Sequence, residues 1–182
     1  MSDQLEVLKM VAGRLNQAGL LYMITGSISV NYYAIPRMTR DIDIVIELKE
    51  KDVEKIYSLF SSDFYIDKES VQKAVREKGI FNIIHNTLIV KIDFIIRKED
   101  AYRMEEFRRR RKTRIEEIEV FLTTPEDLIL SKLYWSKDSR SEMQISDVKN
   151  LLQGVEDLDK EYMKRWADYL GISEFYLEVS SG

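Results

Sequence analysis

Residues 41–46 alternate between two kinds of side chain. Asp41 and Asp43 fall on one face of a strand, because successive side chains point to opposite faces, and the other face carries Ile42, Ile44 and Ile46. Aspartate is disfavoured in strands, and two carboxylates on one face repel each other unless a cation lies between them. The segment 41–48 therefore predicts a strand with one buried face, whose other face either holds a cation or forms a polar, solvent-facing surface.

A second apolar run, residues 88–96, also carries a carboxylate in its middle. Its apolar face is formed by Val90, Ile92, Phe94 and Ile96. Asp93 points to the opposite face. If this strand lies next to segment 41–48, the carboxylates of Asp41, Asp43 and Asp93 converge. Such a trio suits two metal ions that assist an in-line phosphoryl transfer.

A glycine-serine pair separates a short apolar run, residues 20–25, from a predicted helix over residues 28–34. A strand that ends in Gly26-Ser27 and continues as a helix presents backbone N–H groups and a hydroxyl at the helix N-terminus. That arrangement suits a phosphate. The alternative is an ordinary strand–helix turn in which Ser27 caps the helix.

The composition limits the chemistry that these residues can perform. The 182 residues include no cysteine and one histidine, His85, which excludes disulfides, thiolate sites and multi-histidine metal sites. Any catalysis must rest on carboxylates, hydroxyls, lysine and arginine. The net charge is −4, but residues 97–114 hold nine basic and four acidic residues. This basic segment predicts either a strip that faces a polyanion or a solvated helix face.

The hydrophobic periodicity predicts an α/β or α+β core followed by a helical extension. Strands are expected over residues 20–25, 41–48, 80–84, 88–96 and 115–122, with the third and fourth joined by a hairpin. Helices are expected over residues 3–19, 28–34, 51–60, 69–78, 99–112, 126–135, 142–152 and 158–169. We expect a core over residues 1–124 and a helical C-terminal extension over residues 125–182 that packs on it. No signal peptide or membrane-spanning stretch is recognised, so a cytoplasmic protein without a membrane partner is expected.

Two charged residues fall on inward-facing lines of the C-terminal helices. Lys132 lies on or beside the apolar stripe that includes Leu128 and Ile129. Asp147 has Met143 and Leu151 four residues to either side. Because burying an unpaired charge is costly, the two side chains are expected either to pair with each other or to contact a ligand.

Taken together, these residues resemble the nucleotidyltransferase superfamily of DNA polymerase β. The shared pattern is Gly26-Ser27, then Asp41-x-Asp43 after 13 residues, then a later strand aspartate, Asp93. Two further strings, Pro36 to Asp43 and Thr124 to Lys132, are similar to a bacterial branch that includes abortive-infection AbiE-type toxins. The resemblance covers about residues 20–152.

The resemblance implies an α+β fold with a mixed β-sheet, flanking helices and a helical C-terminal extension. It implies an enzyme that moves an NMP from an NTP, such as ATP, to an acceptor hydroxyl and releases pyrophosphate. Asp41, Asp43 and Asp93 would be the catalytic residues and would hold two Mg²⁺ ions. Nucleotide contacts would come from Gly26, Ser27, Arg37, Arg40, Lys132 and Asp147.

The acceptor stays open at this point. A toxin-like modifier of RNA, tRNA in particular, or of protein is the first hypothesis, with an antitoxin as a possible partner chain. A small-molecule (antibiotic) nucleotidyltransferase is the second. A non-catalytic nucleotide- or RNA-binding component of a toxin–antitoxin pair is a third, although a binding module has no need of three metal carboxylates.

Overall fold

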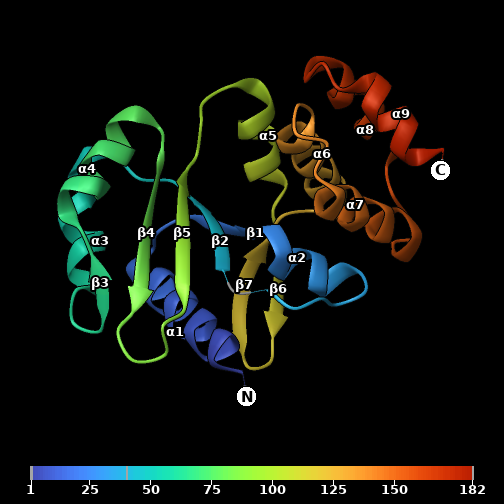
Figure 1. Cartoon of the computed structure of the whole chain (residues 1–182). Helices are drawn as coiled ribbons and strands as arrows, with labels where there is room; N and C mark the ends of the chain where they lie inside the picture. The colour runs from blue at the N-terminus through green and yellow to red at the C-terminus, as the bar shows by residue number, and fades with distance from the viewer. Residues whose placement is uncertain (1, 40, 182) are drawn as a thin grey trace.

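A computed structural model describes residues 2–39 and 41–181 of the chain (Figure 1). Within these residues the helices are α1 (Asp3–Ala18), α2 (Gly26–Tyr33), α3 (Val53–Phe60), α4 (Lys68–Glu77), α5 (Ala101–Arg109), α6 (Pro125–Ser136), α7 (Glu142–Gly154), α8 (Lys160–Tyr169) and α9 (Ser173–Ser180), with a 3-10 turn η1 (Glu50–Asp52) before α3. The strands are β1 (Tyr22–Thr25), β2 (Asp41–Ile46), β3 (Phe64–Ile66), β4 (Ile80–His85), β5 (Lys91–Ile96), β6 (Arg111–Ile115) and β7 (Ile118–Leu122).

The strands form one mixed sheet in the order β3-β4-β5-β2-β1-β7-β6. β2 runs parallel to β5 and β1 runs parallel to β7, whereas the other neighbouring strands are antiparallel. The predicted α+β class with a mixed sheet is thereby confirmed. The predicted hairpin between β4 and β5 is confirmed as well, because these strands pair directly.

The two alternating strands lie side by side at the centre of the sheet. The apolar faces of β2 and β5, which carry Ile42, Ile44, Ile46, Ile92, Phe94 and Ile96, are fully buried in a core that α1, α3 and α4 cover. Their other face therefore points away from this core and carries the carboxylates. Burial of one face thus fixes the orientation of the other, since a shift of one residue would exchange the two faces.

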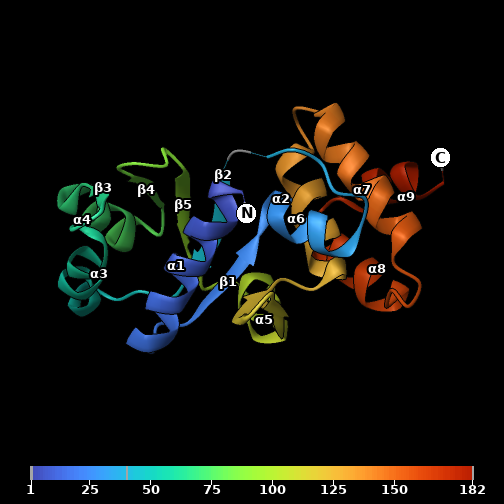
Figure 2. The ribbon, with the colours of Figure 1, turned by 90° about the horizontal axis from the view of Figure 1, so that it is seen from below.

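A second apolar cluster holds the C-terminal helices together. It consists of side chains from α6, α7, α8 and α9, joined by Val30 of α2 and Tyr102 of α5. Figures 1 and 2 show these helices gathered at one side of the molecule, with α2 beside α6 and α7, and with α3 and α4 at the opposite end of the sheet. The boundary at residues 124–125 stays a prediction: α6 begins there, but α2 and α5 contribute to the C-terminal cluster.

The basic segment differs from its prediction. The helix expected over residues 99–112 ends at Arg109, and residues 111–122 form a hairpin, β6 and β7, instead of a single strand over residues 115–122. The turn is made by Glu116 at a φ of 52°, a conformation that side-chain-bearing residues adopt infrequently. No glycine or asparagine marks this turn in the sequence, which explains why it was missed. The short strand β3 and helix α9 were also not predicted.

None of the helices in the described part of the chain is long and apolar enough to cross a bilayer.

Candidate active site

The register between β2 and β5 places two carboxylates directly opposite each other. Asp43 pairs with Asp93, and Asp41 pairs with Lys91 two residues before. The pKa of Asp43 is raised above its ordinary value. Burial is the largest cause, and the neighbouring charge of Asp93 is the second. The prediction that Asp41, Asp43 and Asp93 share one face of neighbouring strands is therefore confirmed, and the register leaves Asp43 and Asp93 as like charges side by side.

Lys91 lies at the edge of this acidic face. Its Nζ is 2.7 Å from Oδ2 of Asp93 and 3.4 Å from Oδ2 of Asp41. The hydrogen bond with Asp93 is the main reason that the pKa of Lys91 is raised, so the side chain is an ammonium at neutral pH. No sequence motif marks Lys91, although its position two residues before Asp93 puts both side chains on one strand face.

Gly26 is required where β1 passes into α2. Its φ is +61°, in the left-handed region, and a Cβ at this position would collide with Oδ2 of Asp43. Only glycine lets the start of α2 approach the Asp43 carboxylate this closely. The Gly26-Ser27 turn and the acidic strand are thus adjacent, as the resemblance to nucleotidyltransferases implies.

Ser27 is the first member of a chain of polar contacts that reaches the C-terminal helices. Its Oγ accepts a hydrogen bond of 2.6 Å from Nη2 of Arg37. The Arg37 guanidinium also donates to both carboxylate oxygens of Asp147, at 2.8 Å from Nε and 2.9 Å from Nη2. Lys132 approaches the same carboxylate, with Nζ 2.9 Å from Oδ2. Of the two alternatives for Lys132 and Asp147, the structure shows the ion pair between them, and Arg37 joins it as a third member.

The ionisation of this group follows from its burial and its contacts. The Asp147 side chain is 1% exposed and that of Lys132 is 6% exposed. Burial lowers the pKa of Lys132, whereas the ion pair with Asp147 opposes this effect. For Asp147 burial acts to raise the pKa, but the hydrogen bonds from Arg37 and Lys132 outweigh it and lower the pKa. The carboxylate is therefore charged and shared between two cations.

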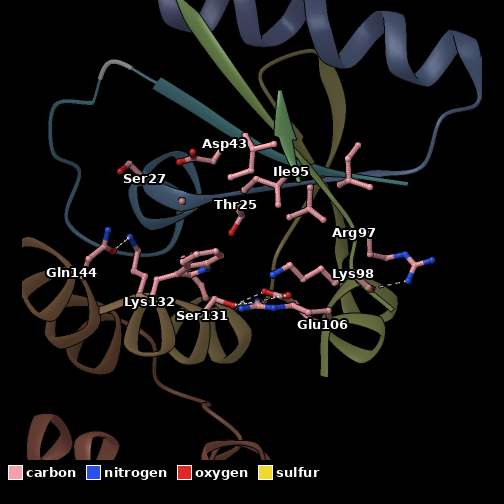
Figure 3. Close-up of a pocket in the computed structure, with 17 residues that line it drawn as sticks. Thr25, Ser27, Asp43, Ile95, Arg97, Lys98, Glu106, Ser131, Lys132 and Gln144 are labelled. Atoms are coloured by element: carbon pink, nitrogen blue, oxygen red, sulfur yellow. Dashed lines mark hydrogen bonds and ion pairs between the residues drawn. The ribbon is translucent and has the colours of Figure 1, made fainter. Parts of the chain in front are cut away.

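A cavity of about 360 Å³ connects these elements. Near one end it is lined by Ser27, Asp43, Lys132 and Gln144, and Nζ of Lys132 donates to Oε1 of Gln144 at 2.8 Å. Figure 3 shows Lys132 and Gln144 reaching from the C-terminal helices toward Ser27 and Asp43 on the sheet side. The cavity continues over Val45 and Ile95 to Arg97, Lys98 and Trp135. Gln144 and Trp135 also line the cavity, and no local sequence pattern marks either residue.

The donor set on the acidic face fits Mg²⁺. Among residues 2–39 and 41–181, no three Asp, Glu, His or Cys side chains are arranged to enclose a metal ion. Mg²⁺, however, is usually bound by one or two carboxylates together with water and substrate phosphates. Asp43 and Asp93 lie opposite each other, with Asp43 against the start of α2, and offer this incomplete set; a cation between them would relieve their repulsion.

The remaining predicted residues have separate outcomes. Arg40 lies outside the described residues. Arg37 contacts Ser27 and Asp147 instead of pointing freely into solvent. The basic segment does not form one strip, because Arg108 pairs with Glu105 while Arg109 pairs with Asp127 in the interior. Its side chains therefore face different partners.

The fold is shared with solved nucleotidyltransferase structures. The chain is similar to an antigenic nucleotidyltransferase-like protein from Paracoccidioides brasiliensis, with a TM-score of 0.59, 17% identity, and 99% of this chain and 93% of the other covered. It is also similar to the antibiotic-resistance factor ANT(2″)-Ia, with a TM-score of 0.58, 11% identity, and 94% and 95% covered. For the lincosamide antibiotic adenylyltransferase LnuA, with lincomycin bound, the values are 0.55, 12%, 84% and 96%.

At these identities the likeness shows the fold alone. No protein-family model matches the sequence, and no curated protein matches it either. The chain has the mixed-sheet fold of nucleotidyltransferases, and Asp43 and the Gly26-Ser27 turn line one cavity.

Proposed function

We propose that the chain is a Mg²⁺-dependent nucleotidyltransferase that moves an NMP from an NTP to an acceptor hydroxyl and releases pyrophosphate. One observation carries this proposal. The Gly26-Ser27 helix start, Asp43 and the buried Lys132 line a single cavity, and Asp93 lies directly opposite Asp43 on the neighbouring strand. A carboxylate pair beside a phosphate-binding helix start is what metal-assisted phosphoryl transfer requires. The shared fold supports the same function.

In this proposal Asp43 and Asp93 hold Mg²⁺, with Asp41 beside them. When bound, Mg²⁺ neutralises charge on the phosphates and polarises the α-phosphate toward attack. The backbone at the start of α2, the Ser27 hydroxyl and the Lys132 ammonium bind the β- and γ-phosphates. Arg37 positions Ser27 through its hydrogen bond to Oγ, and Asp147 in turn holds Arg37.

The chemical step exchanges one phosphorus–oxygen bond for another. The acceptor oxygen forms a bond to the α-phosphorus, and the bond from that phosphorus to the oxygen bridging to the β-phosphate breaks. The proton of the acceptor hydroxyl passes to the carboxylate of Asp93. Pyrophosphate leaves with the electron pair of the broken bond, and Lys132 stabilises its charge.

For the acceptor, we infer RNA, tRNA in particular, or a protein hydroxyl, as in a toxin-like modifier with an antitoxin partner. The likeness of residues 36–43 and 124–132 to AbiE-type sequences supports this choice. The cavity lining adds to the support for RNA. It includes four basic residues (Arg97, Lys98, Arg103 and Lys132) and two acidic ones (Asp43 and Glu106), which favours an anionic ligand over a polycation.

A small-molecule acceptor is the second candidate. LnuA is an adenylyltransferase seen with lincomycin, and ANT(2″)-Ia has been solved with adenylyl-2″-tobramycin. The apolar middle of the cavity, formed by Val45 and Ile95, is compatible with a compact organic acceptor. In this candidate ATP is the nucleotide and an antibiotic hydroxyl is the acceptor.

Label transfer tests the proposal and separates the acceptors. The protein is incubated with each α-³²P-labelled NTP and Mg²⁺, in parallel with total RNA, total protein, lincomycin or tobramycin. We expect label in one of these fractions with wild type and with Asp157→Asn, an exposed aspartate outside the cavity. Asp43→Asn and Asp93→Asn are expected to lose at least a hundredfold in rate. Equal labelling by wild type and Asp43→Asn would overturn the proposal.

A further inference from the structure

Four charged side chains form a square on the site face of β2 and β5. Because the strands are parallel and in register, Asp41 lies opposite Lys91 and Asp43 lies opposite Asp93. Side chains two residues apart on one strand share a face. Three corners of the square are therefore carboxylates, and the fourth is an ammonium.

The ammonium is seated among the carboxylates. Lys91 Nζ lies 2.7 Å from Oδ2 of Asp93, two residues along its own strand, and 3.4 Å from Oδ2 of Asp41 on the neighbouring strand. Asp43 is the corner diagonal to Lys91, and it is the carboxylate that lines the cavity together with Ser27 and Lys132. The Lys91 ammonium thus neutralises part of the charge of Asp41 and Asp93. Asp43 is the carboxylate that faces the nucleotide site.

The charge of the square matches a single divalent ion. With all four groups ionised, three carboxylates and one ammonium carry a net charge of −2. A three-carboxylate site with no lysine would suit two ions, which together with the nucleotide phosphates balance the larger negative charge. A second ion beside Lys91 would instead meet a positive charge within a few ångströms, which is repulsive.

We propose that Lys91 takes the place of a second metal ion, so that the nucleotide complex of this protein holds one divalent cation, between Asp43 and Asp93. This inference rests on the proposed function, since it presupposes a nucleotide and a metal at this face. It assigns Lys91 a positioning role: its ammonium holds Asp93 and Asp41 in place and excludes an ion from their side of the square. It also replaces the two-ion arrangement that the carboxylate trio alone predicts.

Native mass spectrometry counts the ions directly. The folded protein is sprayed with Mn²⁺ and the non-hydrolysable analogue α,β-methylene-ATP, so that each bound nucleotide and each bound ion adds its own mass. We expect one nucleotide and one Mn²⁺ on wild type. Lys91→Met and Lys91→Gln are expected to carry one nucleotide and two Mn²⁺, because removal of the ammonium opens the second position. Equilibrium dialysis of Mn²⁺ repeats the count in solution.

Matched variants separate the role of Lys91 from a general loss of charge. Lys91→Arg keeps a cation at the corner and is expected to keep one Mn²⁺. Lys73→Met removes the same charge from the exposed face of α4 and is expected to behave as wild type. Circular dichroism spectra and melting curves establish that each variant is folded, and the half-exposed position of Lys91 makes either substitution tolerable.

The outcomes distinguish failure of the inference from failure of the proposed function. Two Mn²⁺ on the wild-type complex, or one on both Lys91→Met and Lys91→Gln, would overturn the inference and leave the proposed function standing. Wild type that takes up neither nucleotide nor Mn²⁺ would overturn both.

Discussion

The guanidinium of Arg37 and the carboxylate of Asp147 form a two-point ion pair although 110 residues separate them. The pair joins the loop after α2 to the middle of α7, and through Ser27 and Lys132 it connects both walls of the cavity. A charged carboxylate that is 1% exposed depends on its partners, because water no longer solvates it. The geometry of the phosphate site and the packing of α7 are therefore linked through one side chain.

Removal of the Asp147 carboxylate should destabilise the protein. Asp147→Ala leaves Arg37 and the buried Lys132 without their counter-ion, and breaking a buried ion pair of this kind costs about 3 kcal/mol. Urea unfolding measures the loss. The matched control is Glu178→Ala, which breaks the exposed pair with Arg140 and should cost less than about 1 kcal/mol. Equal losses in the two variants would contradict the buried role of Asp147.

The contribution of Asp147 should depend on pH. Its pKa in the folded protein lies below the ordinary value of 3.8, because the hydrogen bonds from Arg37 and Lys132 outweigh burial. A lowered pKa means that the unfolded chain binds the proton more tightly, so the stabilisation is fully present above the unfolded value and is lost as the pH falls through the folded value. The difference in free energy of unfolding between wild type and Asp147→Asn should be constant near neutrality and shrink below 3.8. A difference that grows in acid would refute this sign.

Substitution of Gly26 should damage the site and not only the backbone. Gly26→Ala places a Cβ against the Asp43 carboxylate, whereas Gly19→Ala, at a similar φ of +65°, meets no atom within 4 Å. Both variants incur about 1–2 kcal/mol for the left-handed backbone. Only Gly26→Ala should also displace Asp43. Melting curves measure the shared cost, and we expect NTP-dependent label transfer to be lost in Gly26→Ala and retained in Gly19→Ala.

Lys132 should carry much of the affinity for the triphosphate. At a free NTP concentration a hundred times the dissociation constant, the nucleotide with Mg²⁺ stabilises wild type by about 2.7 kcal/mol. If Lys132→Met weakens binding a hundredfold, the stabilisation at the same concentration falls to about 0.4 kcal/mol. Thermal melts with and without NTP detect the difference. Lys137→Met, on the same helical segment but outside this cavity, should keep the full shift.

The parts of the fold that were predicted from the sequence are those with strong local periodicity. The alternation in residues 41–46 and 90–96 determined both the strand assignment and the face that carries the carboxylates, because a half-buried strand leaves no freedom in its register. The hairpin of β6 and β7 could not be predicted from the sequence. Its turn contains Glu116 at positive φ, and no glycine or asparagine indicates that conformation there. The exposed, charged side chains of β6 likewise give no hydrophobic pattern.

The residues of the candidate site also divide into those that a local sequence pattern marks and those that no local pattern marks. The sequence marks three site residues, Asp43, Asp93 and Gly26, because each interrupts a local pattern. Such an interruption costs free energy unless the residue has a function. Lys91 and Gln144 are not marked, because a lysine at a strand start and a glutamine on a helix are ordinary in isolation. Their roles depend on which strands and helices become neighbours, and this is decided by packing over long sequence distances.

The link from Ser27 through Arg37 to Asp147 has a consequence during synthesis of the chain. The glycine turn and both acidic strands are translated before α7, and the carboxylate that holds Arg37 follows Arg37 by 110 residues. A nascent chain that ends before α7 therefore presents the carboxylates and the Gly26-Ser27 turn without the Asp147 contact that holds Arg37 in place. The structure thus couples the readiness of the site to the translation of α7.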